Sequence, residues 1–282
     1  MEDKGIRFRI IKDRMFFLFI VFFSLLCAAP LFLIFYYLVK NGLSSISLDF
    51  LLNLPKPVGE EGGGLANAIA GTLLLIVLAS VISIPVGVTA GIYLSENKKS
   101  RTASYVRMFA EILQGVPSIV IGIFVYLWVV VPLGGFSAVS GAIALAVMML
   151  PVIVRSTEET LNLLPYSLKE ASMALGVPYY RTIIKVILPT GFSGILTGVL
   201  LSIARISGET APLLFTAFGN PFWSLDITRP ISCLPLEIYQ YAMSPFPEWH
   251  KMAWGASFVL IVIVLLLNIF SKLGAKKWKV QY

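Results

Sequence analysis

The uncharged run MFFLFIVFFSLLCAAPLFLIFYYLV, residues 15–39 between Arg14 and Lys40, decides the class of fold. A helix that crosses the hydrocarbon core of a membrane needs about 20 mainly apolar residues. The apolar part of a signal peptide is shorter, about 7 to 15 residues. The length of this run therefore predicts a membrane-spanning helix and not a signal peptide.

The composition of the whole chain points to the same class. Of its 282 residues, 57% are hydrophobic and only 13% are charged, and the mean hydropathy is +0.86. Soluble domains carry roughly 25% charged residues, so this chain has too few to cover a soluble surface. Disordered, collagenous and nucleic-acid-binding classes are excluded as well. The two cysteines, Cys27 and Cys233, do not make a disulfide framework and are expected to be unpaired.

Five further segments are apolar enough and long enough to span a membrane. They lie at residues 65–94, 116–133, 137–154, 191–217 and 253–270. Together with residues 15–39 they predict an all-α polytopic membrane protein with six transmembrane helices.

The distribution of Lys and Arg predicts how these helices are oriented, because cations are retained on the cytoplasmic side of short connections. Most of the 22 Lys and Arg residues lie in the two terminal segments and in the connections on the same side. The connections on the other side hold Lys40, Lys56, Arg229 and Lys251. Both termini are therefore predicted to be cytoplasmic. Topology also accounts for most of the net charge of +7, which is weak evidence for an anionic substrate.

The predicted spans divide the chain into four parts. These are a cytoplasmic segment with the first transmembrane helix (1–40), a flexible extracytoplasmic linker rich in Pro and Gly (41–64), a five-helix core (65–272) and a basic cytoplasmic tail (273–282). The core contains two long polar connections, a cytoplasmic one at about residues 155–190 and an outer one at about residues 218–252.

A short helix is predicted within the cytoplasmic connection. Ser167 and Glu170 have the spacing of a capping box, which begins a helix, and Gly176 followed by Pro178 is typical of a helix end. A helix over about residues 168–175 would place Leu168, Ala171, Ser172 and Leu175 on one face. That face could dock on another surface, or the helix could lie on the membrane interface.

The same connection resembles the EAA loop of ABC-importer permeases. The resemblance is carried by EASMALG, residues 170–176, followed by VILP, residues 186–189, with departures from the family pattern at Ser172 and Val186. It implies a type I ABC-importer permease fold. It also implies that Ser167, Glu170, Ala171 and Gly176 belong to a helix that docks on a cytoplasmic ATPase.

The chain has no Gly-x-x-x-x-Gly-Lys-Ser/Thr sequence, the loop that cradles nucleotide phosphates. It is therefore expected to be a transporter subunit and not an enzyme, with no cofactor of its own, while ATP and Mg bind to a partner ATPase. No His, Cys or carboxylate spacing predicts a metal site. Glu111, Glu158 and Glu159 lack an evident nucleophile or metal partner and are interpreted as solvated carboxylates.

The fifth predicted span carries the one strong basic charge at membrane depth, Arg205, with Glu209 four residues later. Extending the helical face of this pair predicts a small and polar stripe, made of Gly198, Ser202, Arg205, Glu209, Pro212 and Thr216. A charged side chain at mid-bilayer costs about 2.5 to 3.5 kcal/mol, so the stripe should face another helix or a water-filled path. Two interpretations stay open: an ion pair that locks two helices together, or an arginine that binds an oxyanion while Glu209 moderates the attraction.

This span also resembles the phosphate-import branch of the permease family. The similarity covers nearly the whole chain, including GETAPLLFT (208–216), AMSPF (242–246) and GVPSIV (115–120). It implies import of inorganic phosphate. In the oxyanion interpretation of the polar stripe, the path includes Ser202, Arg205, Glu209 and Thr216. The alternatives are a permease for sulfate, molybdate or phosphonate, and a proton-coupled secondary transporter in which the Arg and Glu form part of a proton relay.

A helix break is predicted where the third span starts, because Gly115 and Pro117 interrupt the pattern just before Ser118. The break could present backbone amides to an anion, as at the midplane of other transporters, or it could be a turn between an inner surface helix and the third span.

The family resemblance also implies the partners. These are a homologous PstC-like permease subunit, a PstB-like ATPase dimer, a PstS-like phosphate-binding protein and membrane lipid, with no nucleic acid. The expected location is the prokaryotic plasma (inner) membrane, which the chain crosses several times.

Overall fold

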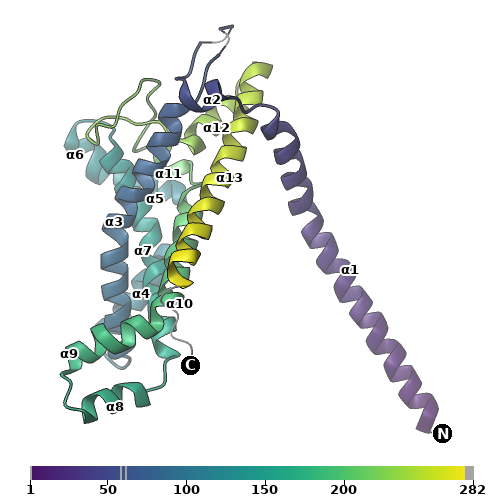
Figure 1. The fold of residues 1–282 in the computed structure, drawn as a ribbon, viewed down its shortest axis with the longest axis vertical. Coiled ribbons are helices and arrows are strands. Elements are labelled where there is room, and N and C mark those ends of the chain that lie inside the picture. The colour runs from purple at the N-terminus through teal and green to yellow at the C-terminus, as the bar shows by residue number, and fades with distance from the viewer. Residues whose placement is uncertain (1, 58, 61, 277–282) are drawn as a thin grey trace.

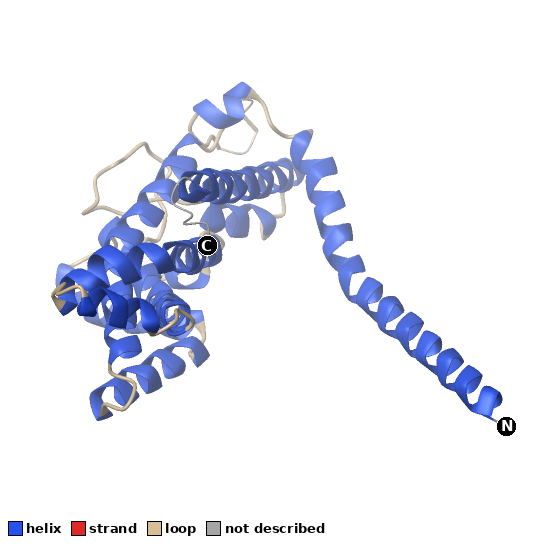
Figure 2. Ribbon diagram, turned by 60° about the horizontal axis from the view of Figure 1, so that its bottom comes forward, coloured by secondary structure: helices blue, strands red, loops and turns tan. Residues whose placement is uncertain are grey.

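A computed structural model describes residues 2–57, 59–60 and 62–276, and Figure 1 shows the arrangement. The described residues form helices and loops, with a single isolated bridge between Phe218 and Ile231 (Figure 2). The helices are α1 (Glu2–Leu43), α2 (Leu48–Leu52), α3 (Ala66–Glu96), α4 (Arg101–Gly115), α5 (Ser118–Val125), α6 (Val131–Leu133), α7 (Ala138–Asn162), α8 (Ser167–Ala174), α9 (Tyr179–Thr182), α10 (Leu188–Ile206), α11 (Ala211–Leu214), α12 (Leu234–Ala242) and α13 (Pro247–Lys276). Two π-helical segments, η1 (Tyr126–Val130) and η2 (Ile183–Ile187), join α5 to α6 and α9 to α10.

The predicted spans correspond to the long helices. Within the described residues, five helices are long and apolar enough to cross a membrane: Phe8–Leu43, Ala66–Glu96, Ala138–Asn162, Tyr179–Ile206 and Pro247–Phe270. The sixth candidate is a pair, Arg101–Gly115 and Ser118–Leu133, bent by 107° at the intervening break. The all-α polytopic fold is confirmed, and the predicted third span, residues 116–133, is the second arm of this bent pair.

The fifth span differs from its predicted bounds at both ends. It begins at Tyr179, inside the predicted cytoplasmic connection, because α9, η2 and α10 form one continuous helix. It stops at Ile206, well short of residue 217. The helix ends in a turn at Ser207, and Pro212 then occupies the first turn of the short helix α11, where its missing N–H costs no helical hydrogen bond.

Helix α7 is the centre of the bundle, and small residues let its neighbours approach closely. A Cβ atom at Gly87 of α3 would lie 2.7 Å from Ile153 Cγ2 of α7. On the other side, a Cβ at Gly198 of α10 would lie 1.9 Å from Ser156 Oγ. Close backbone approach through glycine is how membrane helices gain packing energy without a hydrophobic driving force between them. Helices α3, α7 and α10 therefore form the rigid core.

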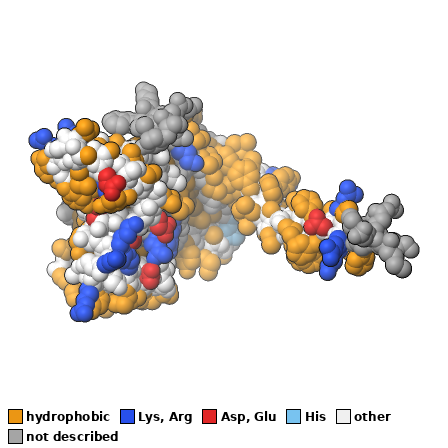
Figure 3. All heavy atoms as spheres, turned by 90° about the horizontal axis from the view of Figure 1, so that it is seen from below, with side chains coloured by type: hydrophobic (Ala, Val, Ile, Leu, Met, Phe, Trp, Pro, Cys, Tyr) orange, Lys and Arg blue, Asp and Glu red, His pale blue; other side chains and the backbone are white. Residues whose placement is uncertain are grey.

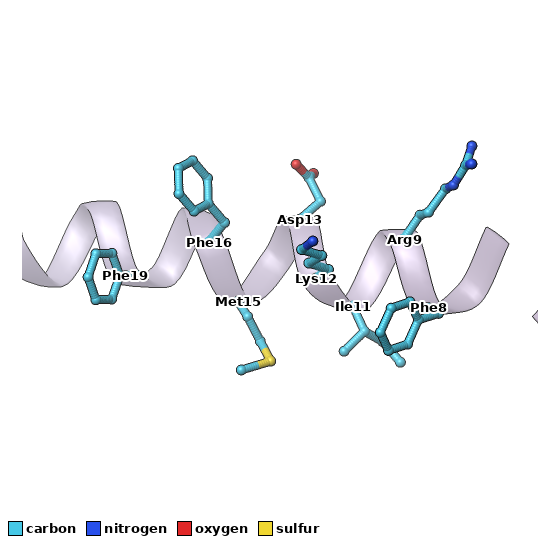
Figure 4. Close-up of a pocket in the computed structure, with 8 residues that line it drawn as sticks. All are labelled: Phe8, Arg9, Ile11, Lys12, Asp13, Met15, Phe16 and Phe19. Atoms are coloured by element: carbon cyan, nitrogen blue, oxygen red, sulfur yellow. The ribbon is translucent and has the colours of Figure 1, made fainter. Parts of the chain in front are cut away.

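Helix α1 stands apart from this core over most of its length (Figure 1). Its last turns pack on α13, where Leu38 is buried and a Cβ at Gly42 would lie 2.6 Å from Phe258 Cβ. Figure 4 shows the side chains of Phe8 to Phe19 projecting from the helix with no other element drawn opposite them. This surface carries apolar side chains together with Arg9, Lys12 and Asp13, and it has no packing partner within the described chain, so its apolar part suits lipid or another subunit.

The two ends of the bundle differ in charge. The end that carries α8, seen from below in Figure 3, gathers Lys and Arg side chains together with several carboxylates. The opposite end, called the loop end below, holds α2, α12 and residues 215–233. Helix α1 begins at the level of α8 and ends at the level of the loop end (Figure 1). The part of the predicted basic tail at residues 277–282 lies outside the described residues.

Candidate functional site

Helix α8 ends in the way that the sequence predicts. Gly176 has φ +78°, the left-handed conformation that favours glycine. Its N–H donates to Met173 O at 2.9 Å, and the N–H of Val177 donates to Ser172 O at 3.3 Å. These two bonds form a Schellman motif, which satisfies the last carbonyls of the helix.

The start of α8 corrects the predicted capping box. Tyr166 is the N-cap, and its carbonyl accepts from the N–H groups of Lys169 at 2.9 Å and Glu170 at 3.2 Å. Ser167 is already inside the first turn, so its hydroxyl does not cap the helix. Pro165 begins the turn one residue earlier, and its carbonyl accepts from Leu168 N–H at 3.2 Å.

The residues of the predicted docking face of α8 point to two sides, one packed against the rest of the chain and one exposed. Leu168 packs against the cluster that contains Ile183 and Ile187, and the buried Ser172 hydroxyl lies 2.9 Å from Thr182 Oγ1. These contacts hold α8 on the start of the long helix. Glu170, Ala171 and Gly176 are exposed, and Leu175 is 84% exposed. The outward side therefore presents an apolar and acidic surface that the described chain leaves open.

An ion pair joins α8 to the end of α3. Lys169 Nζ contacts Glu96 Oε1, and the hydroxyl of Tyr179 donates to Glu96 Oε2. The side chains of Lys169 and Glu96 are each 13% exposed, so the pair is largely shielded from water. This contact cannot be predicted from sequence spacing, because its members are separated by α4 to α7 along the chain.

A second ion pair fastens α4 to α7 and to the same end of α3. Arg107 Nε lies 2.6 Å from Glu158 Oε1, while its other nitrogens donate to Leu94 O at 2.9 Å and Lys98 O at 3.3 Å. The interpretation of Glu158 as a solvated carboxylate is therefore wrong, because this residue is only 8% exposed.

The interpretation of Glu111 and Glu159 as solvated carboxylates agrees with their exposure. Both carboxylates are exposed, and both pair with the guanidinium of Arg155, at 2.6 and 3.0 Å. The described residues contain no group of three or more His, Cys, Asp and Glu side chains that could hold a metal ion.

Arg205 and Glu209 lie where the fifth span ends. Arg205 occupies the last turn of α10, and its Nε is 3.9 Å from Glu209 Oε1, beyond the helix terminus. The side chains are 44% and 20% exposed. The predicted stripe along one continuous helix is wrong, because the helix stops at Ile206 and Thr216 lies in a turn after α11.

Ser202 and Thr216 do not share the exposed surface of Arg205. Both residues are fully buried, and each hydroxyl donates to a backbone carbonyl a few residues earlier. Ser202 donates to Val199 O at 2.7 Å, and Thr216 donates to Pro212 O at 2.8 Å. The exposed side of α10 carries other residues at four-residue spacing, namely Ser193, Thr197, Leu201 and Arg205.

Helix packing fixes the depth of Arg205. Helices α7 and α10 run antiparallel, with Gly198 against Ser156 and Gly194 against Thr160. Arg205 lies about 10 Å farther along α10 than Gly198, at 1.5 Å per residue. That level on α7 is close to Met149, near the middle of its 25 residues. The guanidinium is therefore rooted at the centre of the bundle, on a side that is partly open.

The predicted break at Gly115 and Pro117 is confirmed. Helix α4 ends at Gly115, α5 begins at Ser118, and the two meet at 107°. A Cβ at Gly122 of α5 would lie 2.7 Å from Pro212 Cα, so α5 abuts the segment that follows Glu209. The broken helix and the interrupted fifth span are therefore neighbours.

A buried acid lies at the loop end. Glu237 of α12 is 7% exposed, accepts a hydrogen bond from Ser232 Oγ and is hydrogen-bonded to Tyr241. Burial raises the pKa of the Glu237 carboxyl and, in the same cluster, the pKa of the Tyr241 hydroxyl. Glu237, Tyr241 and Trp249 help to line a cavity of about 620 Å³ between residues 54–57, the loop at residues 218–222 and α12.

The arrangement of a short helix with an open outward side, a glycine-packed bundle and a mid-bundle arginine agrees with the comparisons with known proteins. Residues 83–277 match the family described as the binding-protein-dependent transport system inner membrane component. The chain belongs to this permease family. The match includes α8 and the complete helix Tyr179–Ile206, and it leaves α1 outside.

Relatives of this permease extend over most of its length. It is 50% identical to the phosphate transport system permease protein PstA of Yersinia pestis, over 85% of this chain and 82% of the relative. It is 39% identical to the probable phosphate transport system permease protein PstA of Methanocaldococcus jannaschii, over 93% and 92%. A structure of the inward-facing MetNI methionine ABC transporter matches with a TM-score of 0.60 and 21% identity, over 77% of this chain and 95% of that chain. The predicted importer-permease fold is confirmed.

Proposed function

We propose that the chain is the transmembrane permease subunit of an ATP-driven importer of inorganic phosphate and forms half of the translocation path. The relatives named as phosphate transport permeases support the substrate. The observation that carries the mechanism is one helix, Tyr179–Ile206, which begins next to α8 and ends at Arg205.

This helix is a rod between the two functional ends. Its 28 residues span about 40 Å. Leu168 and the hydrogen bond between Ser172 and Thr182 hold α8 on the first turns of this long helix. The close glycine contacts with α7 hold the middle of the long helix. A displacement of α8 by a closing ATPase therefore moves the rod, and with it the surroundings of Arg205.

Arg205 and Glu209 supply the anion chemistry. A guanidinium presents a planar fork of donors that matches the oxygens of phosphate. Glu209, at 3.9 Å, weakens the hold on a dianion and can accept a hydrogen bond from a protonated phosphate. The pair can therefore attract the anion and still release it. Ser202 and Thr216 are buried and support this segment from behind, and the break at Gly115, Pro117 and Ser118 shapes the neighbouring wall.

The partners follow from the same surfaces. A PstB-like ATPase dimer, which binds ATP and Mg²⁺, contacts Glu170, Ala171 and Leu175 on the outward side of α8. A homologous PstC-like permease completes the path on the side of Arg205. A PstS-like binding protein delivers phosphate at the loop end. In this arrangement both termini are cytoplasmic.

The test is uptake of labelled phosphate into vesicles that contain the complete complex, with and without ATP. Arg205→Gln is compared with Arg229→Gln, which removes another arginine that pairs with a carboxylate but is 74% exposed in the outer loop. We expect uptake to require ATP. In Arg205→Gln uptake should fall at least tenfold, because the variant loses about one charge-assisted hydrogen bond to the anion. Arg229→Gln should match the wild type with equal recovery of all subunits.

Three outcomes would contradict the proposal. Uptake that persists without the ATPase would indicate a proton-coupled secondary transporter. Competition by sulfate, molybdate or phosphonate at the concentration of phosphate would indicate another oxyanion as the substrate. Loss of subunit recovery in Arg205→Gln would show that the arginine and Glu209 form a structural ion pair.

A further inference from the structure

The end of α3 that lies next to α8 joins four elements, α3, α4, α8 and α9. Glu96, the last residue of α3, contacts Lys169 of α8 and Tyr179 of α9. Just before and after it, the carbonyls of Leu94 and Lys98 accept from the guanidinium of Arg107 on α4. The end of α3 therefore lies between the coupling helix and the helix that leads to the break.

The contacts at Glu96 are suited to carry force. One carboxylate oxygen contacts the ammonium of Lys169, and the other accepts from the Tyr179 hydroxyl, so both oxygens are occupied. Both partners of the ion pair are 13% exposed, in contrast to the Arg155–Glu159 pair, whose side chains are 45% and 64% exposed. Shielded pairs are screened less by salt and hold their geometry better than exposed ones.

Helix α8 is consequently attached to two rods. The hydrogen bond between Ser172 and Thr182 attaches it to the helix that ends at Arg205, and the ion pair of Lys169 with Glu96 attaches it to α3. A rigid unit held at both points moves α3 and the long helix together. Without Glu96, α8 would still pull the long helix but could slide past α3.

We propose that Glu96 is a positioning residue for coupling, which fixes α8 to the end of α3 so that movement of α8 also reaches α4 and its break through Arg107. The proposal rests on the proposed function, since it needs an ATPase acting on α8. It concerns the route of the movement and is independent of which anion is carried.

The route from α3 onward is continuous. Arg107 is bonded at the same time to the Leu94 carbonyl of α3 and, at 2.6 Å, to Glu158 of α7. Helix α4 continues from Arg107 to Gly115, where the chain turns by 107° into α5. Because α5 abuts Pro212, a shift of α4 changes the wall next to Glu209. Movement of α3 with α4 and movement of the helix Tyr179–Ile206 therefore both reach the surroundings of Arg205 and Glu209.

The first test is a double-mutant cycle in the reconstituted complex. Glu96→Ala, Lys169→Ala and the double variant are compared for phosphate taken up per ATP hydrolysed, with Glu159→Gln as the matched exposed carboxylate at the same end. We expect each single variant to lower this ratio about fivefold with unchanged subunit recovery. The double variant should lose no more than Glu96→Ala alone, since that variant already lacks the contact with Lys169.

The second test measures the attachment directly and needs no phosphate. Spin labels at Asn97→Cys and Met173→Cys, in a Cys27→Ser background, report the distance between the end of α3 and α8. In the wild-type background the distance should stay the same when ATP binds, whereas with Glu96→Ala it should shift. If ATP binding leaves the distance unchanged with Glu96→Ala as well, the proposal is overturned.

The two tests also separate this proposal from the proposed function. An unchanged uptake ratio, additive single variants, or subunit recovery that falls in step with uptake would each contradict a coupling role for Glu96. A wild-type complex that takes up no phosphate would contradict the proposed function, and the spin-label distances would still decide the role of Glu96.

Discussion

Glu237 shows how burial sets the chemistry of one residue. Its carboxyl is enclosed at the loop end beside Ser232 and Tyr241, and burial raises its pKa because the charged form loses its hydration. The folded chain therefore binds this proton more tightly than the unfolded chain does. The stabilisation is complete below the ordinary pKa of a glutamate and is lost as the pH rises toward the raised pKa.

Replacing this group should remove the pH dependence that it causes. Glutamine has the shape of the neutral acid and keeps hydrogen-bonding capacity toward Ser232. We expect Glu237→Gln to raise the unfolding temperature of the detergent-solubilised complex at pH 8 by about 2 to 4 °C, the equivalent of about 1 kcal/mol, and to have a smaller effect at pH 5. A difference of the same size at both pH values would show that the carboxyl does not titrate between the folded and unfolded states.

Individual residues also show what a sequence can reveal about a site. Arg205 and Glu209 are visible because charge in an apolar span is costly and needs a reason. Ser202 and Thr216 share their spacing, yet both hydroxyls are spent on their own backbone, which no spacing rule detects. Glu96 and Glu158 gain their importance from partners that are distant along the chain, so their carboxylates look like any solvated acid in the sequence.

Helix ends were predictable where the backbone itself demands a residue type. Gly176 has a left-handed conformation, and Gly115 with Pro117 mark a break, so local chemistry was enough in both places. The end of the fifth span was not predicted because hydropathy continues past Ile206 while the helix does not. The π-helical segment η2 ends two residues before Pro189, as η1 ends two residues before Pro132, and the long helix continues past the proline.

The cap of α8 gives a prediction at the scale of one element. Proline fixes φ near −65° and has no N–H, so Gly176→Pro removes both the left-handed turn and the bond to Met173 O. We expect phosphate uptake to fall at least tenfold, with the chain still inserted in the membrane and less ATPase recovered by pull-down. Gly135→Ala, in a loop with open space around it, is the control. Normal uptake and normal ATPase recovery would rule out a docking role for α8.

The seam between α7 and α10 gives another prediction. A Cβ atom at Gly198 would lie 2.2 Å from Ser156 Cβ, so Gly198→Ala must push the two helices apart. We expect a loss of about 1 to 3 kcal/mol, seen as a lower unfolding temperature of the solubilised complex. The double variant Gly198→Ala with Ser156→Gly should recover most of the loss. If the single variant is as stable as Gly135→Ala, the helices are less tightly packed than described.

The excess of cations at the α8 end predicts the orientation of the whole molecule in the membrane. Met243 after α12 is 72% exposed at the loop end, and Leu163 after α7 is 84% exposed near α8. In a Cys27→Ser background, an impermeant maleimide added to intact cells should label Met243→Cys at once and Leu163→Cys only after the membrane is opened. The reverse pattern would place α8 outside the cell and contradict both the predicted topology and the coupling role.

The contact between α1 and α13 has a consequence for how the chain is made. The last turns of α1 meet Trp254 and Phe258, which belong to the final helix, while the rest of α1 has no packing partner in the described chain. During synthesis α1 enters the bilayer first and is stable there alone, because its apolar surface and internal hydrogen bonds suit lipid. Helix α1 therefore waits in the bilayer for α13, and their contact forms only after α3 to α12 have been synthesised.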